Sequence, residues 1–167
     1  MVSRCEKPEA CQVVSVCAQQ GRIPCVDVVS FHGEKLRLCD ALEAVADSLP
    51  ARVDLLKCLR IANELVPLLR ESHRYEEEYV FPVFERGAAG VAGRLSSIRR
   101  LKAEHVEDEC AAQDITDALF SIGHGAPVEN PEALGFMLRS FFETLRRHIA
   151  FERDHVLPAV VAASSPE

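Results

Sequence analysis

The chain has no tryptophan, only 6% aromatic residues and no long uninterrupted apolar run among its 167 residues. Because a membrane-spanning helix needs roughly 18 or more consecutive apolar residues, the sequence predicts no membrane span. The first residues, MVSRCEKPEACQVV, also lack the apolar core of a signal peptide. A cytoplasmic location is therefore expected.

Basic residues are outnumbered by acidic ones. Lys and Arg total 19 against 26 Asp and Glu, which gives a net charge of -7. Binding to phosphate groups needs clustered Lys and Arg, so we expect neither nucleic acid nor an anionic membrane as a partner. The hydrophobic content of 48% and the charged content of 27% are ordinary for a globular protein. A chain of this length fits one domain.

Paired cysteine spacing is missing as well, because none of the seven cysteines forms a CxxC motif. This excludes a zinc knuckle, and the odd number argues against a complete set of disulfides. Most of the cysteines are predicted to be reduced thiols. Four of them mark an N-terminal segment, residues 1–25, ahead of a predicted bundle at 26–163 and a tail at 164–167; they are Cys5, Cys11, Cys17 and Cys25.

Glycine and proline gather at three breaks, and between the breaks apolar residues recur at spacings of three and four, which is typical of helices. Asn130 followed by Pro131 gives the best helix start, and Gly87 and Gly123 are predicted stops. Short connections imply antiparallel neighbours, so the fold class is all-α, an up-down-up-down four-helix bundle. The breaks are SLPA near residue 50, RGAAG near residue 88 and GHGAPVENP at 123–131.

Histidines replace apolar residues at seam positions of the last three predicted helices. A helix rises about 1.5 Å per residue, so residues equally far from a hairpin turn lie at the same height. His73 and His105 are about equally far from the second turn, and His105 and His148 from the third. For His32 the count differs by six residues, or roughly 9 Å, so its placement is the weakest.

Carboxylates follow His73, His105 and His148 at i+3 or i+4, the spacings that bring two helical side chains together. A single seam histidine is more often an ordinary core residue, but this coincidence on three helices favours a metal site. A carboxylate buried without a partner costs several kcal/mol, so a cluster of them demands a cation. The roles of His155 and Asp108 stay open. The carboxylates are Glu76 and Glu77 after His73, Asp108 and Glu109 after His105, and Glu152 after His148.

The order of these motifs resembles the hemerythrin-like (HHE cation-binding) family, whose signature is His, HxxxE, His, HxxxE. The chain has His32, then HRYEEEYVFPVF at 73–84, then His105, then HIAFERDHVLPAV at 148–160. The resemblance implies two iron ions with an oxo or hydroxo bridge, with manganese or zinc less favoured. The implied metal ligands are His32, His73, Glu76 or Glu77, His105, Glu109, His148 and Glu152.

Two departures from the family pattern stand out. Pro82 follows His73 by nine residues, whereas Pro158 follows His148 by ten. Alignment on the prolines therefore pairs Ser72 with His148 and Glu76 with Glu152; Glu77 matches the motif, but Glu76 matches the seam. Oxygen-carrying relatives have a second histidine where this chain has Glu109, which puts reversible oxygen carriage in doubt.

The resemblance suggests a protein that binds or senses a small diatomic molecule, oxygen or nitric oxide, or the iron or redox state. A vacant iron position would be lined by Phe81, Phe141 and Leu145. The alternative is an enzyme-like role in repairing iron-sulfur clusters or in reducing nitric oxide or peroxide. A third possibility is a metal-free interaction bundle. Catalysis, a protein partner and the oligomeric state are left open.

Overall fold

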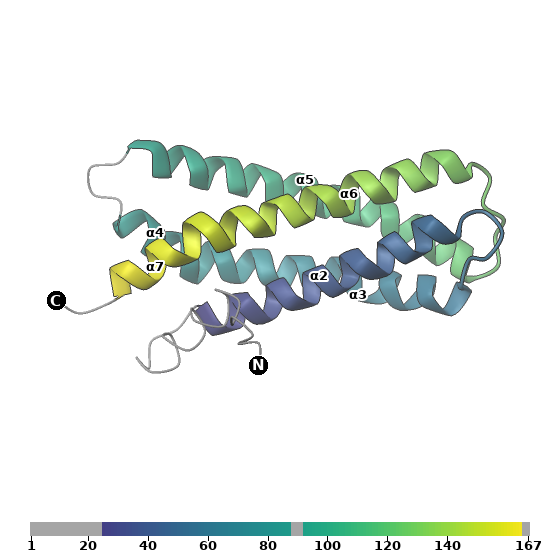
Figure 1. Cartoon of the computed structure of the whole chain (residues 1–167), viewed down its shortest axis with the longest axis horizontal. Helices are drawn as coiled ribbons and strands as arrows, with labels where there is room; N and C mark the ends of the chain where they lie inside the picture. Colours follow the sequence, from purple (N-terminus) through teal and green to yellow (C-terminus); the bar gives the residue numbers. More distant parts are fainter. Residues whose placement is uncertain (1–24, 88–91, 165–167) are drawn as a thin grey trace, which may run out of the picture.

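The computed structural model describes residues 25–87 and 92–164, and all of the secondary structure in these ranges is helical. Four rods run along one another (Figure 1). Two of them are interrupted by a short π-helical turn. The first rod is α2 (Cys25–Ser48); the second is α3 (Leu55–Tyr75), η1 (Glu76–Val80) and α4 (Phe81–Arg86); the third is α5 (Ala92–Gly123); the fourth is α6 (Pro131–Phe151), η2 (Glu152–Val156) and α7 (Leu157–Ser164).

Successive rods run in opposite directions, with α2 packed against α3 and α6, and α5 packed against α3 and α6 (Figure 1). The predicted all-α, up-down-up-down four-helix bundle is therefore confirmed. Among the described residues, no helix is long and apolar enough to cross a membrane. The bounds predicted for the N-terminal segment and the tail stay predictions, because residues 1–24 and 165–167 lie outside the described ranges, together with Cys5, Cys11 and Cys17.

The helix ends follow the local chemistry of the sequence. The Asn130 side chain accepts a hydrogen bond from the Ala133 N–H at 2.9 Å, and Pro131 begins α6. An N-cap of this kind satisfies one of the backbone donors that a helix start leaves free. Asp54 caps α3 in the same way, and Gly123 is the last residue of α5. The predicted helix start at Asn130-Pro131 is thus confirmed.

Two apolar clusters fill the bundle, and a polar layer separates them. On α2, Val28 belongs to one cluster and Leu38 to the other. On α5, Leu101 and Ala112 belong to opposite clusters in the same way. The buried polar side chains fall between these positions along every rod. They are His32, Lys35, Ser72, His73, Glu76, His105, Asp108, His148 and Glu152.

The π-turns lie beside this polar layer, and each precedes a proline. In η1 the Phe81 N–H bonds to the Glu76 carbonyl, and in η2 the Leu157 N–H bonds to the Glu152 carbonyl. A proline lacks an N–H and its ring clashes with the carbonyl four residues earlier, so a regular α-helix is unfavourable there. The wider turn before Pro82 and before Pro158 accommodates the ring. Turns of this kind are frequent at functional sites.

Three cysteines whose side chains the structure describes form no disulfide. Cys39 and Cys58 are buried free thiols, and Cys110 is an exposed free thiol. Burial raises the pKa of Cys39 to about 12. The expectation of reduced thiols holds for these three positions.

Candidate metal centre

Four buried residues from three rods bring potential metal ligands together in the polar layer. They are Glu76, His105, His148 and Glu152, and each offers one ligand atom within 4.8 Å of the others. All four are between 0% and 4% exposed. The chain brings them together because η1, α5 and the α6–η2 junction reach the same height in the bundle. Sequence analysis had singled out all four residues.

The three seam histidines stand at one level, as expected from their distances to the turns. The ring of His73 stacks on that of His105, with ring centroids 3.9 Å apart. The ring of His105 stacks in turn near that of His148, with centroids 5.1 Å apart. The rings of Phe81 and His105 are also stacked, at 5.5 Å. The imidazoles therefore form a short column across the core.

Carboxylates outside the cluster hold two of these rings in orientation. His73 Nδ1 is 3.1 Å from Glu109 Oε1, and His105 Nδ1 is 2.9 Å from Glu77 Oε1. A carboxylate on one ring nitrogen fixes the tautomer and leaves the other nitrogen available to a metal. The side chains of Glu77 and Glu109 are 34% and 30% exposed. The structure thus places both at the edge of the site, whereas Glu76 lies inside the cluster.

His148 is surrounded by acidic groups but makes no hydrogen bond. Its Nδ1 lies 3.3 Å from Glu104 Oε2 and 3.7 Å from Asp108 Oδ2. Its Nε2 lies 3.5 Å from Glu152 Oε1. Both ring nitrogens remain without a hydrogen-bond partner. Asp108 Oδ2, which lies beside the outer nitrogen of His148, also lacks a hydrogen-bond partner.

The first rod contributes a histidine and a lysine. His32 Nε2 is 2.9 Å from Glu152 Oε2, so the roughly 9 Å offset expected from residue counting is absorbed. Lys35 Nζ donates to Glu76 Oε1 at 2.9 Å, and both side chains are fully buried. Sequence analysis missed Lys35. Its position one turn after His32, on the stripe that continues to Leu38, is the signal that could have identified it.

The ammonium group of Lys35 sets the electrostatics of the carboxylates. Burial by itself would raise the pKa of Glu76, but Lys35 and His105 together more than offset burial, and the pKa falls to about 2. Burial also opposes ionisation of Glu152, yet the neighbouring side chains of His148, His32 and Lys35 bring its pKa well below the usual range. Burial would lower the pKa of Lys35, whereas Glu76 and Glu152 raise it overall. The layer therefore holds two carboxylates and one ammonium group in their charged forms.

The imidazoles respond differently to the same surroundings. Burial, helped by repulsion from His105, lowers the pKa of His73 to about 2. Burial also acts to lower the pKa of His105, but the neighbouring carboxyl groups of Glu76 and Glu77 raise it overall. Burial raises the pKa of Asp108. His73 is consequently a neutral imidazole, the form that binds metals.

The site passes a simple test of fit for a cation. Buried polar atoms without a partner are uncommon in folded proteins, and each costs free energy unless an ion or water satisfies it. Here several such atoms, both histidine nitrogens and carboxylate oxygens, lie in or beside the same cluster. Imidazole nitrogen and carboxylate oxygen together suit iron, manganese and zinc. The atoms are His73 Nε2, Glu76 Oε2, His105 Nε2, Asp108 Oδ2, His148 Nδ1 and Nε2, and Glu152 Oε1.

Two further histidines lie away from the cluster. His155 is exposed, and its ring stacks on Phe151 with centroids 4.7 Å apart. His124 lies in the turn after α5, where its Nδ1 is 2.8 Å from the Phe120 carbonyl. The ligand roles of all the predicted residues stay predictions, those of His32, His73, Glu77 and Glu109 outside the four-residue cluster included, as does the pair of irons.

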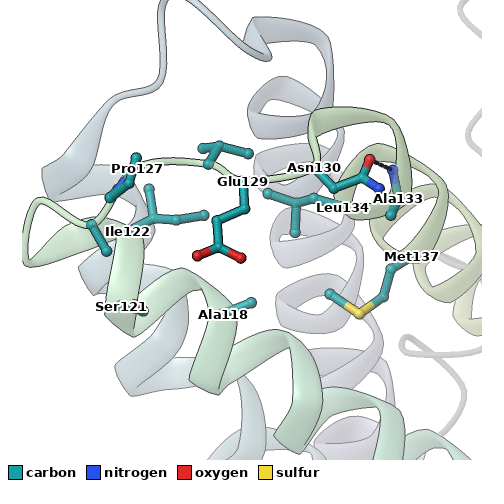
Figure 2. A pocket seen from close by; sticks show the side chains of 11 residues that line it. Ala118, Ser121, Ile122, Pro127, Glu129, Asn130, Ala133, Leu134 and Met137 are labelled. Atoms are coloured by element: carbon teal, nitrogen blue, oxygen red, sulfur yellow. Dashed lines mark hydrogen bonds between the residues drawn. The ribbon is translucent and has the colours of Figure 1, made fainter.

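A separate pocket of about 490 Å³ lies at the turn between α5 and α6. Figure 2 shows the Glu129 carboxyl group extending over it, with Ile122, Leu134 and Met137 around it. None of the cluster residues lines this pocket. It is therefore distinct from the candidate metal centre.

Comparison with known proteins agrees with this geometry. The model of the family described as Hemerythrin HHE cation binding domain matches residues 27–160. That range contains all four rods up to α7 and every residue of the polar layer. Searches of curated proteins and of solved structures gave no match. Because the match covers most of the chain, the protein belongs to the hemerythrin HHE cation-binding domain family.

Proposed function

We propose that this chain binds non-haem iron in the polar layer of the bundle and uses it to bind or sense a small diatomic molecule. The observation that carries the proposal is the convergence of unsatisfied nitrogen and oxygen atoms from Glu76, His105, His148 and Glu152 at one buried point. Groups arranged in this way lower their free energy when a cation is bound.

The ligand chemistry favours iron over the other candidates. Mixed imidazole and carboxylate ligands on the helices of a bundle are typical of iron and manganese carboxylate proteins. The described cysteines contribute no thiolate to the cluster, so the soft ligands that favour structural zinc are missing there. Iron bound here would be able to change its oxidation state and to bind a small ligand.

Burial of the cluster limits the size of the molecule that can reach it. The four cluster residues are at most 4% exposed. Phe81 stacks on His105, and Phe141 and Leu145 are buried on α6 just before His148. A closed site between two apolar clusters admits a small neutral molecule such as oxygen or nitric oxide far more readily than a larger polar substrate.

Metal analysis combined with absorption spectroscopy tests the proposal. Protein purified without added metal should contain iron in excess of manganese and zinc. The reduced protein should change its absorption spectrum when nitric oxide is added. The spectrum of protein treated with a chelator should not change.

Thermal unfolding gives an independent measure of binding. A metal that binds only the folded chain at about 100 times its Kd adds roughly 2.7 kcal/mol to the free energy of unfolding. For a chain of this size we expect Tm to rise by about 5–10 °C. Protein that contains only zinc, or no metal, and whose Tm is unaffected by ferrous iron would refute the proposal.

A further inference from the structure

The second and fourth rods carry the same backbone device, which fixes the equivalence of their residues. Glu76 begins η1 and Glu152 begins η2, and the two turns have the same length. Each turn is followed by an apolar residue and a proline, Pro82 in one rod and Pro158 in the other. Glu76 therefore corresponds to Glu152.

By the same equivalence Ser72 corresponds in position to His148, since each lies four residues before its glutamate. Ser72 is fully buried and its Oγ donates to Glu76 Oε1 at 2.7 Å. His73 is not among the four residues whose ligand atoms lie within 4.8 Å of one another, and its ring stacks on that of His105. One half of the site thus has an imidazole beside its glutamate, and the other half has a hydroxyl group.

The Lys35 ammonium group lies on the side that lacks the imidazole. It is 0% exposed and contacts the same Glu76 oxygen as Ser72. A buried ammonium group beside a carboxylate supplies positive charge where a metal ion would otherwise lie. A second metal ion would be repelled by it in this weakly screened interior.

Each of the two glutamates has one oxygen that is hydrogen-bonded and one that is not. Glu76 Oε1 accepts from Lys35 and Ser72, and His32 Nε2 contacts Glu152 Oε2 at 2.9 Å. The other two oxygens have no hydrogen-bond partner. Glu76 Oε2 is 3.3 Å from His105 Nε2, and Glu152 Oε1 is 3.5 Å from His148 Nε2. The free oxygen of each glutamate therefore lies beside an imidazole of the same four-residue cluster.

We propose that this chain holds a single metal ion, bound by Glu76, His105, His148 and Glu152, and that the Lys35 ammonium group takes the place of a second metal ion. The inference rests on the proposed function, because it specifies how many ions the same site binds. It departs from the pair of bridged irons expected from the sequence. The donor set fits one ion, and the surroundings of Lys35 do not fit two.

Anaerobic titration of the metal-free protein with ferrous iron tests the stoichiometry. After removal of free metal, elemental analysis should give about one iron per chain. After oxidation, a single ferric ion gives an electron paramagnetic resonance signal, whereas an oxo-bridged ferric pair gives none. Two irons per chain without a signal would overturn this inference and leave the proposed function intact. No bound metal would refute both.

The role of Lys35 is tested by a variant that should bind more iron ions per chain than the wild type. The double variant Lys35→Met with Ser72→His removes the ammonium group and adds the missing imidazole beside Glu76. We expect the iron content to rise about twofold, to two ions per chain. Arg37→Met is the matched control, because Arg37 lies on the same helix and pairs with Glu64 at the surface. This control should keep one ion.

The result is interpreted together with the circular dichroism spectrum of the variant. A helical double variant that still binds one ion would overturn the role given to Lys35. If the double variant does not fold, the spin state of oxidised wild-type protein still decides between one ion and a coupled pair.

Discussion

At the residue scale, the site depends on imidazoles whose two nitrogens have different partners. His73 and His105 each present one nitrogen to an outer carboxylate and leave the other without a partner. His148 has neither nitrogen hydrogen-bonded. Such arrangements are stable when an ion satisfies the inner nitrogens. Substitutions at these positions should consequently affect metal binding more than folding.

His148→Ala should abolish stoichiometric iron binding, because it removes a buried nitrogen that has no partner other than the metal. The expected metal content falls at least about tenfold, and the Tm increase on addition of iron disappears. Elemental analysis and thermal unfolding measure both. His124→Ala is the control, since His124 lies in an exposed turn outside the cluster. Full iron content in His148→Ala would show that this histidine is not a ligand.

Glu77→Gln should weaken metal binding without abolishing it, because Glu77 orients His105 through its Nδ1 at 2.9 Å. Loss of a carboxylate partner of this kind lowers metal affinity by about 10–100-fold. A competition titration with a chelator measures the change. Glu78→Gln is a matched control, since Glu78 is the exposed next residue of the same π-turn. If Glu77→Gln binds no metal at all, Glu77 is itself a ligand.

At the element scale, the π-turns determine which side chains enter the core. The sequence alone left Glu76 and Glu77 as alternatives, because the motif spacing and the seam spacing disagree. The wider turn at η1 leaves Glu76 fully buried and puts Glu77 at the edge. Pro82 follows this turn, and a proline disfavours a regular helix before it. The same device at η2 buries Glu152.

Close packing between elements gives a prediction about glycine. A Cβ at Gly123 would lie 2.5 Å from Leu59 Cγ and 3.2 Å from the Leu55 carbonyl oxygen, whereas one at Gly33 meets nothing within 4 Å. Gly123→Ala should destabilise the protein by about 1 kcal/mol through overpacking. Gly33→Ala in the middle of α2 should stabilise it by about 0.5–1 kcal/mol. Urea unfolding measures both. Equal effects of the two substitutions would contradict the packing of α5 on α3.

At the scale of the whole molecule, the polar layer makes stability depend on pH. The pKa of Glu76 is about 2 in the folded protein against an ordinary value of 4.5. Its contribution is present above about pH 4.5 and is lost as the pH falls towards 2. His73, whose pKa is also lowered, acts in the same direction below pH 6.5. His105 acts oppositely, because its raised pKa favours folding at lower pH.

Metal-free protein should therefore lose a few kcal/mol of unfolding free energy between pH 5 and pH 3. Urea unfolding in the presence of a chelator at a series of pH values measures this loss. Glu64→Gln should show the same pH dependence as the wild type, because Glu64 is half-exposed in a surface pair with Arg37. Constant stability over this range would show that the buried carboxylates are not charged in the folded protein.

The sequence by itself determined the bundle and the level of the histidines. Helix periodicity and the three breaks are local properties, and a constant rise per residue converts distance from a turn into height. His73, His105 and His148 were therefore predictable from counting along the chain. The side of each helix that faces the core follows from the same periodicity.

Only the tertiary structure decided which groups share an oxygen atom. Lys35 is an ordinary charged residue in the sequence, and nothing local indicates that its side chain is fully buried beside Glu76. The same holds for the contact between His32 and Glu152. These contacts join residues on different rods or on a wider turn, so they depend on how the rods tilt and pack against one another. The number of cations in the core is for that reason a property of the packed bundle.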